Sequence, residues 1–419
     1  MLGELWTLLP PNAHKGKVVY QTTIRSLFVT AAFLAFSVSA GSAEQRGVTD
    51  SEIRIGQTMP YSGPLSAYSV LGKAEIAYFN LVNDRGGIYG RKIKLISLDD
   101  GYVPPRTVEQ TRRLVESDEV ALIFSSLGTA QNNAIAKYLH AKNVPQLFLA
   151  SGASKFGDIS QFPKALMGIQ APFRLEARLY AKHAVDKLKA TKIAVLAQND
   201  DFGRDYLAGL RDILGSRFEQ VVSVATYEVT EPTIDSQVVR LKASEADVFL
   251  IAATPKFAAQ AIRKAHEIGW KPTRFLSNVS IWVSSVMEVA GLGAGIGIIS
   301  TAFAKDPMDP TWSGDRGVKD WREFMAKYAP DGDIRDQNYV FGYNFAMALE
   351  HVLKAAGNDL SPENIHKQAY SIRDLELPML LPGIKVNTAP DDHTPVKQMQ
   401  FMRFDGKQWE RFGEILTAN

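Results

Sequence analysis

The sequence has 419 residues, of which 46% are hydrophobic and 22% charged, so it can bury a large core and is long enough for two domains. Its 47 basic and 45 acidic residues give a formal net charge of +2 with no long basic run, so we expect no nucleic-acid partner. The absence of cysteine excludes disulfides, thiolate metal sites and cysteine nucleophiles.

Residues 1–43 have the layout of a secretory signal peptide that carries extra residues at its start. Basic residues up to Arg25 precede an apolar run at 27–38, and small residues follow as far as Ala43. A single membrane anchor is the alternative interpretation, but the run is shorter than the ~20 residues that span a bilayer. The pattern therefore predicts cleavage after Ala40 or Ala43 and export to the periplasm.

From Ile53 onward, short apolar runs alternate with amphipathic stretches, which is the pattern of βαβ units around a parallel sheet. The first half predicts four strands, at residues 53–59, 93–98, 121–124 and 144–150. Apolar residues at helical spacing predict helices after the first three strands, around residues 71–81, 108–115 and 135–139.

The pattern restarts after residues 168–172, a proline-bearing stretch that we expect to cross between two lobes. A helix carrying Leu175, Leu179 and Leu188 should follow. The remaining predicted elements are strands at residues 193–197, 221–227, 248–252 and 274–277 with helices between them, a glycine-rich strand at 295–302 leading back to the first lobe, helices around 321–328 and 339–355, and a β-hairpin at 398–412. The expected fold class is α/β, with a mainly parallel sheet flanked by helices in each lobe.

Common catalytic motifs do not occur in the sequence. The glycines at residues 291–297 stand at alternate positions, which does not match a dinucleotide loop, and Gly72-Lys73 lacks the rest of a phosphate loop. The histidines are scattered, and the one acidic cluster with histidine, at 391–393, lies among turn residues. We therefore expect no enzyme, no cofactor and no metal.

Small and hydroxyl-bearing residues follow the predicted strands instead. Loops at the carboxyl ends of parallel strands expose N–H groups and helix amino termini, which suit a carboxylate. The first-lobe candidates in these loops are Ser62, Ser126, Leu127, Gly128, Thr129, Gly152, Ala153 and Ser154.

Several segments resemble type I periplasmic binding proteins of the leucine/isoleucine/valine-binding group, which serve ABC importers. Residues 60–64 read PYSGP and residues 83–93 read NDRGGIYGRKI, the most specific match. Further similarity at 125–129, 150–154 and 201–203 extends the resemblance over most of the chain.

The resemblance implies a two-lobed flytrap with three crossovers and the ligand between the lobes. It places the amino-terminal lobe at residues 48–170 plus about 301–372, and the carboxy-terminal lobe at 171–300 plus about 373–419. The expected partners are a small carboxylate and the permease of an ABC importer, and the chain is expected to be a monomer. The alternative is a periplasmic ligand sensor that passes lobe closure to a regulator.

The resemblance also adds site residues to those in the strand-end loops. Tyr68 corresponds to an aromatic that covers the ligand, and Phe202 stands where relatives have tyrosine. Thr254 and Asn278 lie in second-lobe loops, and Tyr343, or its neighbour Tyr339, would face the cleft from the returning segment.

One departure from the family bears on the ligand. Relatives that bind amino acids place an acidic residue after the fourth strand of the second lobe, whereas residues 277–282 read SNVSIW. A buried ammonium without a counter-charge costs several kcal/mol. A branched-chain or other hydrophobic amino acid stays open as the ligand if Asp200 or Asp201 reaches the site, but we hypothesise an aromatic or aliphatic carboxylate instead.

Overall fold

Five parallel strands form the first sheet, in the order β2-β1-β3-β4-β5. The computed structural model describes residues 45–417. The strands are short runs of apolar residues that are buried on both faces at the centre of the sheet, as parallel sheets require. Their bounds are β1 (Glu52–Met59), β2 (Lys92–Asp99), β3 (Leu122–Phe124), β4 (Gln146–Leu149) and β5 (Ala165–Met167).

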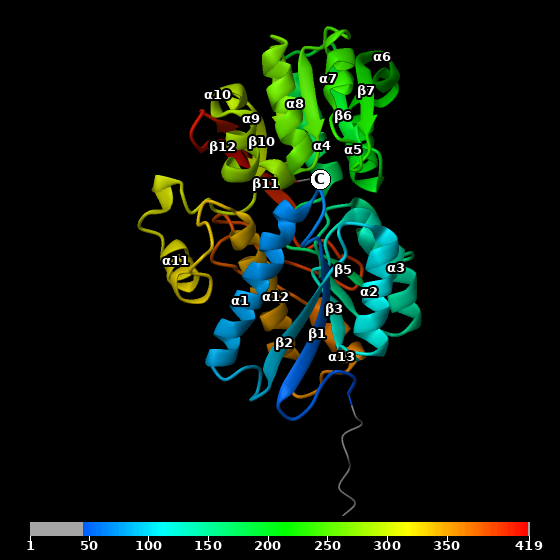
Figure 1. The fold of residues 1–419 in the computed structure, drawn as a ribbon, viewed down its shortest axis with the longest axis vertical. Helices are drawn as coiled ribbons and strands as arrows, with labels where there is room; N and C mark the ends of the chain where they lie inside the picture. The colour runs from blue at the N-terminus through cyan, green and yellow to red at the C-terminus, as the bar shows by residue number, and fades with distance from the viewer. Residues whose placement is uncertain (1–44, 418–419) are drawn as a thin grey trace, which may run out of the picture. The chain divides into compact units, whose positions relative to one another are not determined.

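Helices cover both faces of this sheet. In Figure 1, α1 and α12 lie together on one face, and α2 and α3 lie on the other. α1 stops before Gly86-Gly87, where both glycines have positive φ, and α2 begins at Pro104, a residue that suits the first helical position. The helices are α1 (Ser69–Asp84), α2 (Pro104–Glu116), α3 (Thr129–Ala141), α11 (Arg316–Tyr328), α12 (Asn338–Ala356) and α13 (Pro362–Ala369).

The second sheet has seven strands in the order β12-β11-β10-β9-β8-β6-β7. Strands β6 to β10 are parallel to one another, while β11 and β12 are a hairpin that adds antiparallel to β10. The bounds are β6 (Ile193–Gln198), β7 (Val222–Tyr227), β8 (Val248–Ala252), β9 (Thr273–Leu276), β10 (Ile299–Ala302), β11 (Gln398–Phe404) and β12 (Trp409–Thr417).

Two helix pairs sandwich the second sheet. α4 packs on α5, and α7 packs on α8, with their apolar residues facing the strands. The helices are α4 (Phe173–Asp186), α5 (Asp201–Leu214), α6 (Phe218–Val221), α7 (Asp235–Lys242), α8 (Pro255–Glu267), α9 (Glu288–Ala290) and α10 (Leu292–Gly295).

The chain passes between the two sheets three times: after β5, after β10 and between α13 and β11. The second sheet is therefore completed by the last strands of the chain, while α11 to α13 return to the helices of the first sheet. The predicted fold class, a two-lobed α/β fold with three crossovers, is confirmed. It brings the carboxyl ends of both sets of parallel strands to the boundary between the lobes.

Several elements differ between the prediction and the structure. β5 was not predicted, because it has only three residues at the edge of the sheet. The strand predicted at 295–302 begins only at Ile299, since Gly295 ends α10 and Gly297 has φ +82°. α4 ends at Asp186, so Leu188 lies beyond the helix and is partly exposed.

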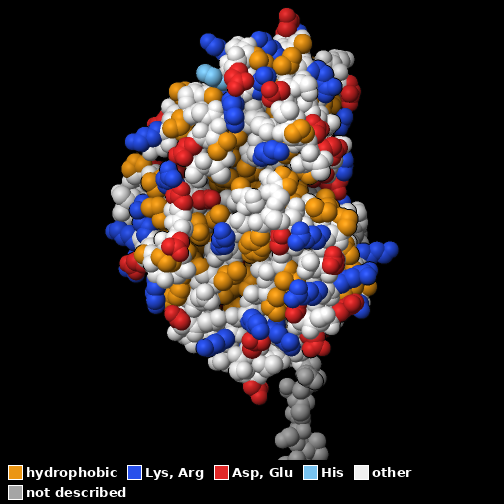
Figure 2. Space-filling model, viewed as in Figure 1, with side chains coloured by type: hydrophobic (Ala, Val, Ile, Leu, Met, Phe, Trp, Pro, Cys, Tyr) orange, Lys and Arg blue, Asp and Glu red, His pale blue; other side chains and the backbone are white. Residues whose placement is uncertain are grey.

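Acidic and basic side chains are interspersed over the face of the molecule shown in Figure 2, in keeping with the near-balanced charge. Within residues 45–417, every helix is too short or too polar to cross a membrane. The predicted signal peptide, residues 1–43, lies outside the described residues.

Candidate functional site

The carboxyl ends of β3 and β4 bring two hydroxyl groups to the start of α3. Thr129 is the first residue of that helix and Ser151 follows β4, and their Oγ atoms lie 2.8 Å apart in a buried position. The first N–H groups of a helix have no partner within it, and the helix dipole is positive at this end. This corner therefore offers neutral donors to an anion.

Gly128 lies at the same corner, and because it has no side chain its backbone can lie close to Gln131 and Tyr102. Its φ is +110°, and a Cβ atom would lie 2.1 Å from Oε1 of Gln131 and 2.7 Å from the ring of Tyr102. The Gln131 amide also donates to the Tyr102 carbonyl oxygen at 2.9 Å. A larger residue at 128 would therefore strain the backbone and displace Tyr102, which lines the site.

Thr254 and Asn278 supply polar groups from the second lobe. Thr254 precedes α8, and its hydroxyl donates to Oε1 of Gln198 at 3.3 Å. Asn278 follows β9 and is 1% exposed, yet neither its Nδ2 nor its Oδ1 has a hydrogen-bond partner. A buried amide without partners loses the hydrogen bonds it made to water, so this side chain is poised for a ligand.

These groups surround one cavity that residues of both sheets line. Its volume of ≈ 60 Å³ exceeds the ~10–15 Å³ that one water needs, so it has room for several waters or a small ligand. The lining residues are Tyr68, Leu71, Tyr102, Leu127, Gly128, Thr129, Ala150, Ser151, Gln170, Phe173, Phe202, Thr254, Asn278, Val279, Trp282, Phe303, Asn338, Phe341 and Phe345.

Aromatic rings form much of the cavity wall. Tyr68 reaches from the first lobe to the second, where its hydroxyl donates to the Val279 carbonyl oxygen at 2.8 Å, and burial raises its pKa well above the ordinary value. Phe202 packs edge-on against Phe173, with ring centroids 4.8 Å apart. The cavity therefore suits a ligand with an apolar body.

The polar atoms that line the cavity are neutral, and donors predominate among those without partners. Nε2 of Gln170, Nε1 of Trp282 and both amide atoms of Asn278 are buried and unpaired. None of the described residues that line the cavity is Asp, Glu, Lys, Arg or His. Since each buried unpaired donor costs about 1–3 kcal/mol, a ligand with hydrogen-bond acceptors would be stabilised here.

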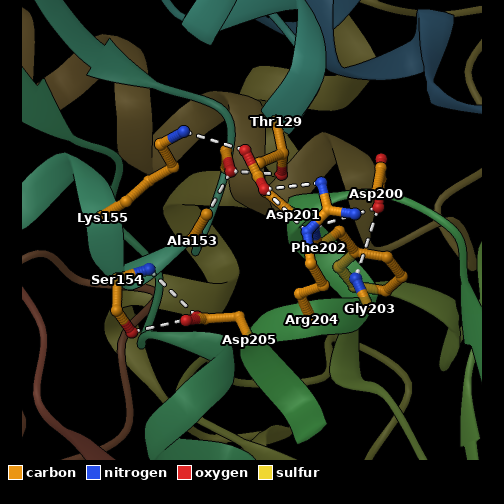
Figure 3. Close-up of polar contacts among 11 residues, drawn as sticks. Thr129, Ala153, Ser154, Lys155, Asp200, Asp201, Phe202, Gly203, Arg204 and Asp205 are labelled. Carbon is orange, nitrogen blue, oxygen red and sulfur yellow. Dashed lines mark hydrogen bonds and ion pairs between the residues drawn. The ribbon is translucent and has the colours of Figure 1, made fainter. Parts of the chain in front are cut away.

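The two acidic residues that could have reached a ligand ammonium are engaged elsewhere. Asp200 caps α5 by accepting from the Phe202 and Gly203 N–H groups at 3.0 and 3.3 Å, and burial raises its pKa. Asp201 pairs with Lys155 at 2.8 Å and with Arg204 at 2.7 Å. Figure 3 shows both carboxylates with these partners, and neither aspartate lines the cavity.

Another polar contact joins the lobes beside the cavity. Ser154, from the loop after β4, donates its N–H and its hydroxyl to Oδ2 of Asp205 on α5, at 3.0 and 2.9 Å (Figure 3). The same oxygen accepts from the N–H of Arg174, the second residue of α4. Asp205 therefore ties the start of the second lobe to a first-lobe loop.

The structure brings about half of the predicted site residues together. The predicted residues that line the cavity are Tyr68, Leu127, Gly128, Thr129, Phe202, Thr254 and Asn278. Those that lie outside the lining are Ser62, Ser126, Gly152, Ala153, Ser154 and Tyr343.

The residues outside the lining have identifiable structural contacts. Ser62 donates to Asp99, and the Ser126 hydroxyl accepts from the Thr58 N–H. Gly152 packs against the first crossover, where a Cβ atom would lie 2.7 Å from Nε2 of Gln170. The Ala153 N–H donates to the Ser151 hydroxyl at 3.2 Å. Tyr343 packs in the core against Tyr78 and Phe324, and Tyr339 is also outside the lining.

The sequence analysis expected the returning segment to contribute Tyr343 or Tyr339, but it missed other residues of the same helix, α12, and Gln170 of the first crossover. Asn338, Phe341 and Phe345 share one face of α12 at i, i+3 and i+7, a spacing that could have marked them as a group. Gln170 and Tyr102 carry no comparable signal, because they enter the cavity from a crossover and from a loop after an edge strand.

Comparisons with known proteins agree with this geometry. A family model described as "Periplasmic binding protein" matches residues 52–408. This chain belongs to the periplasmic binding protein family. It is 25% identical to "Leu/Ile/Val-binding protein homolog 7" of Brucella abortus, with 92% of this chain and 95% of that protein covered.

Solved structures of periplasmic binding proteins share the fold. A branched-chain amino acid ABC transporter protein of Thermus thermophilus with bound valine matches with a TM-score of 0.78 at 15% identity, covering 88% of this chain and 98% of that one. A fatty acid ABC transporter substrate-binding protein of Thermomonospora curvata matches with a TM-score of 0.74 at 19% identity, covering 90% and 95%.

Membership of this family means that the chain binds a solute and is not an enzyme. The described part of the chain contains no cluster of three His, Cys, Asp or Glu side chains able to hold a metal ion. The chemistry of the site is therefore that of neutral donors, helix termini and aromatic walls.

Proposed function

We propose that this periplasmic binding protein is the solute-binding component of an ABC importer, and that its ligand is a small hydrophobic carboxylate without an ammonium group. The observation that carries the proposal is Asn278, a buried neutral amide in a cavity whose described lining has no carboxylate.

The carboxylate end of the ligand is assigned to the first lobe. Thr129 and Ser151 place hydroxyl groups there, and the first turn of α3 adds N–H groups and the positive end of its dipole. Hydrogen bonds from neutral donors to a charged acceptor are about twice as strong as those between neutral groups. An anion can therefore be held without a lysine or arginine.

An ammonium group on the ligand would be poorly tolerated. It would have to leave water for a site walled by Phe202, Trp282 and Phe341, with no counter-charge among the described lining residues. That transfer costs several kcal/mol. The unpaired N–H groups of Gln170 and Trp282 are donors and so offer an ammonium no acceptor.

Transport would follow from closure of the two lobes. We take the lobes to be residues 48–170 with about 301–372, and 171–300 with about 373–419. A ligand that contacts Thr129 on one lobe and Asn278 on the other favours the closed form, which displays the surface that a permease recognises. We propose that this occurs in the periplasm with the protein as a monomer.

Isothermal titration calorimetry with matched pairs of ligands tests the proposal. Leucine and 4-methylpentanoate differ only by the ammonium group, as do phenylalanine and 3-phenylpropanoate. We expect at least one amine-free acid to bind about tenfold or more tightly than its amino acid, a difference of about 1.4 kcal/mol. Nanomolar binding of leucine together with no response to the amine-free acids would contradict the proposal.

A variant pair tests where the carboxylate binds. Thr129→Val removes a hydroxyl from the cavity and should weaken binding of the amine-free acid about five- to tenfold. Thr111→Val makes the same change at a buried threonine of α2 whose hydroxyl has no partner and which does not line the cavity. It should leave binding unchanged.

A further inference from the structure

Glu176 is a buried carboxyl group at the junction of the first crossover and the ligand cavity. It lies in the first turn of α4 and is 0% exposed. It accepts from Thr301 at 2.6 Å, from Tyr180 at 2.5 Å, from Tyr206 and from the backbone N–H of Asn278 at 3.1 Å. Its partners thus come from α4, α5, β10 and the loop after β9.

Among residues 45–417, no cation contacts Glu176, and its hydrogen-bond partners allow two arrangements of protons. The Tyr180 hydroxyl lies 2.5 Å from Glu176 Oε1 and also 2.7 Å from the Leu276 carbonyl oxygen. A carbonyl can only accept, and the tyrosine has a single proton. If Tyr180 donates to Leu276, Glu176 must be protonated to donate to Tyr180; if Glu176 is ionised, Tyr180 donates to Glu176 instead.

Both arrangements of protons involve hydrogen bonds to the residues just before Asn278. Leu276 ends β9, and Tyr206 also contacts the hydroxyl of Ser277 at 2.6 Å. The Asn278 side chain has no hydrogen bond of its own, so its position depends on the backbone on either side of it. Its N–H is bound most strongly when Glu176 carries a charge, because hydrogen bonds to charged acceptors are the stronger ones.

We propose that Glu176 is a positioning residue that, in its ionised form, holds Asn278 in the orientation that binds ligand, so that ligand affinity rises with pH across the neutral range. The inference rests on the proposed function of the cavity. Ligand binding would then favour ionisation of Glu176 and release a proton.

The surroundings of Glu176 raise its pKa into the neutral range that the proposal requires. Burial raises its pKa to about 7, opposed by the hydrogen bonds from Thr301, Tyr180, Tyr206 and Asn278. The titratable groups that contact it are Tyr180 on α4 and Tyr206 on α5, and burial raises both of their pKa values well above the ordinary range. From the β9 loop and β10 it is faced by uncharged side chains.

Calorimetry with 3-phenylpropanoate and 4-methylpentanoate at several pH values tests the proposal, since both acids stay ionised between about pH 5.5 and about pH 8.5. We expect the affinity for each acid to fall about five- to tenfold when the pH is lowered from about 8.5 to about 5.5. The heat of binding near pH 7 should depend on the buffer, because binding releases a proton. Glu176→Gln should bind with an affinity that no longer depends on pH. Equal pH dependence in the wild type and Glu176→Gln would overturn the proposal.

A matched control and a ligand-free measurement complete the test. Glu75→Gln changes another fully buried carboxyl, on α1 and outside the cavity lining, and should keep the pH dependence of binding. Without ligand, the NMR shifts of the Asn278 backbone amide should titrate near pH 7 in the wild type. If neither acid binds, the proposed function fails, but a flat Asn278 titration would separately overturn the role of Glu176.

Discussion

At Asn278, a neutral amide stands in the cavity where a carboxylate could pair with an ammonium group. The residue is 1% exposed and both of its amide atoms lack partners, so a substitution of the same shape tests charge alone. Asn278→Asp would repel a plain carboxylate and attract an ammonium. We expect calorimetry to show 4-methylpentanoate binding weakened about tenfold and leucine binding strengthened by a similar factor.

The control for this substitution is Ser62→Ala. Ser62 also follows a strand of the first lobe, but it lies outside the cavity lining and donates to Asp99. It should leave the ratio of the two affinities unchanged. If Asn278→Asp also leaves that ratio unchanged, the side chain at 278 does not determine the ligand class.

At the scale of elements, the sequence predicted strands best where apolar runs were long and bounded by turn residues. β1, β2 and β6 to β8 were predicted within two residues of their observed ends. β5 has only three residues at a sheet edge, and neighbouring β4 determines its pairing. The alternating glycines before β10 looked like a strand, but Gly295 belongs to α10 and Gly297 adopts positive φ.

The same reasoning explains which site residues could be predicted. Leu127 to Thr129, Thr254 and Asn278 follow strands, and parallel strands place all such residues at one edge. The face of α12 toward the cavity depends on how that helix packs on α1, which local patterns do not specify. The prediction therefore named Tyr343, whereas Phe341 and Phe345 line the cavity.

The contact between α5 and the loop after β4 gives a prediction about stability. Asp205 Oδ2 accepts from the N–H and hydroxyl of Ser154 and from the N–H of Arg174. Asp205→Ala leaves these three donors without their acceptor, so we expect the free energy of unfolding to fall by about 2–3 kcal/mol. Urea unfolding followed by circular dichroism would measure the loss.

Asp235→Ala provides the comparison for that experiment. Asp235 begins α7 and pairs with Lys264 at 2.9 Å near the surface. Exposed ion pairs contribute about 0–1 kcal/mol, so the loss should be clearly smaller. Equal losses in the two variants would mean that the link between α5 and the first lobe adds little stability.

For the whole molecule, buried and exposed carboxyl groups act on stability in opposite directions as pH changes. Burial raises the pKa of Glu75 to about 8, and this group lies between α1 and β1 beside Gln57. By contrast, hydrogen bonds from the N–H and hydroxyl of Thr191 lower the pKa of Asp247. Groups of the second kind lose their stabilising effect at low pH, while Glu75 loses its effect as pH rises.

Glu75→Gln should therefore change how stability depends on pH. In the wild type, the contribution of Glu75 is fully present below the ordinary value of about pH 4.5 and declines as pH rises to about 8. Glutamine keeps the shape of the glutamate side chain and cannot ionise. We expect the free energy of unfolding of the variant, relative to the wild type, to rise across this window by an amount on the order of a few kcal/mol. Urea unfolding at a series of pH values would measure it.

The control is Glu116→Gln. Glu116 is an exposed glutamate whose pKa is lowered by a hydrogen bond from Tyr138, so this variant should give a curve of unfolding free energy against pH that is parallel to that of the wild type in the same window. Parallel curves for Glu75→Gln as well would show that Glu75 is not a protonated group of the folded protein.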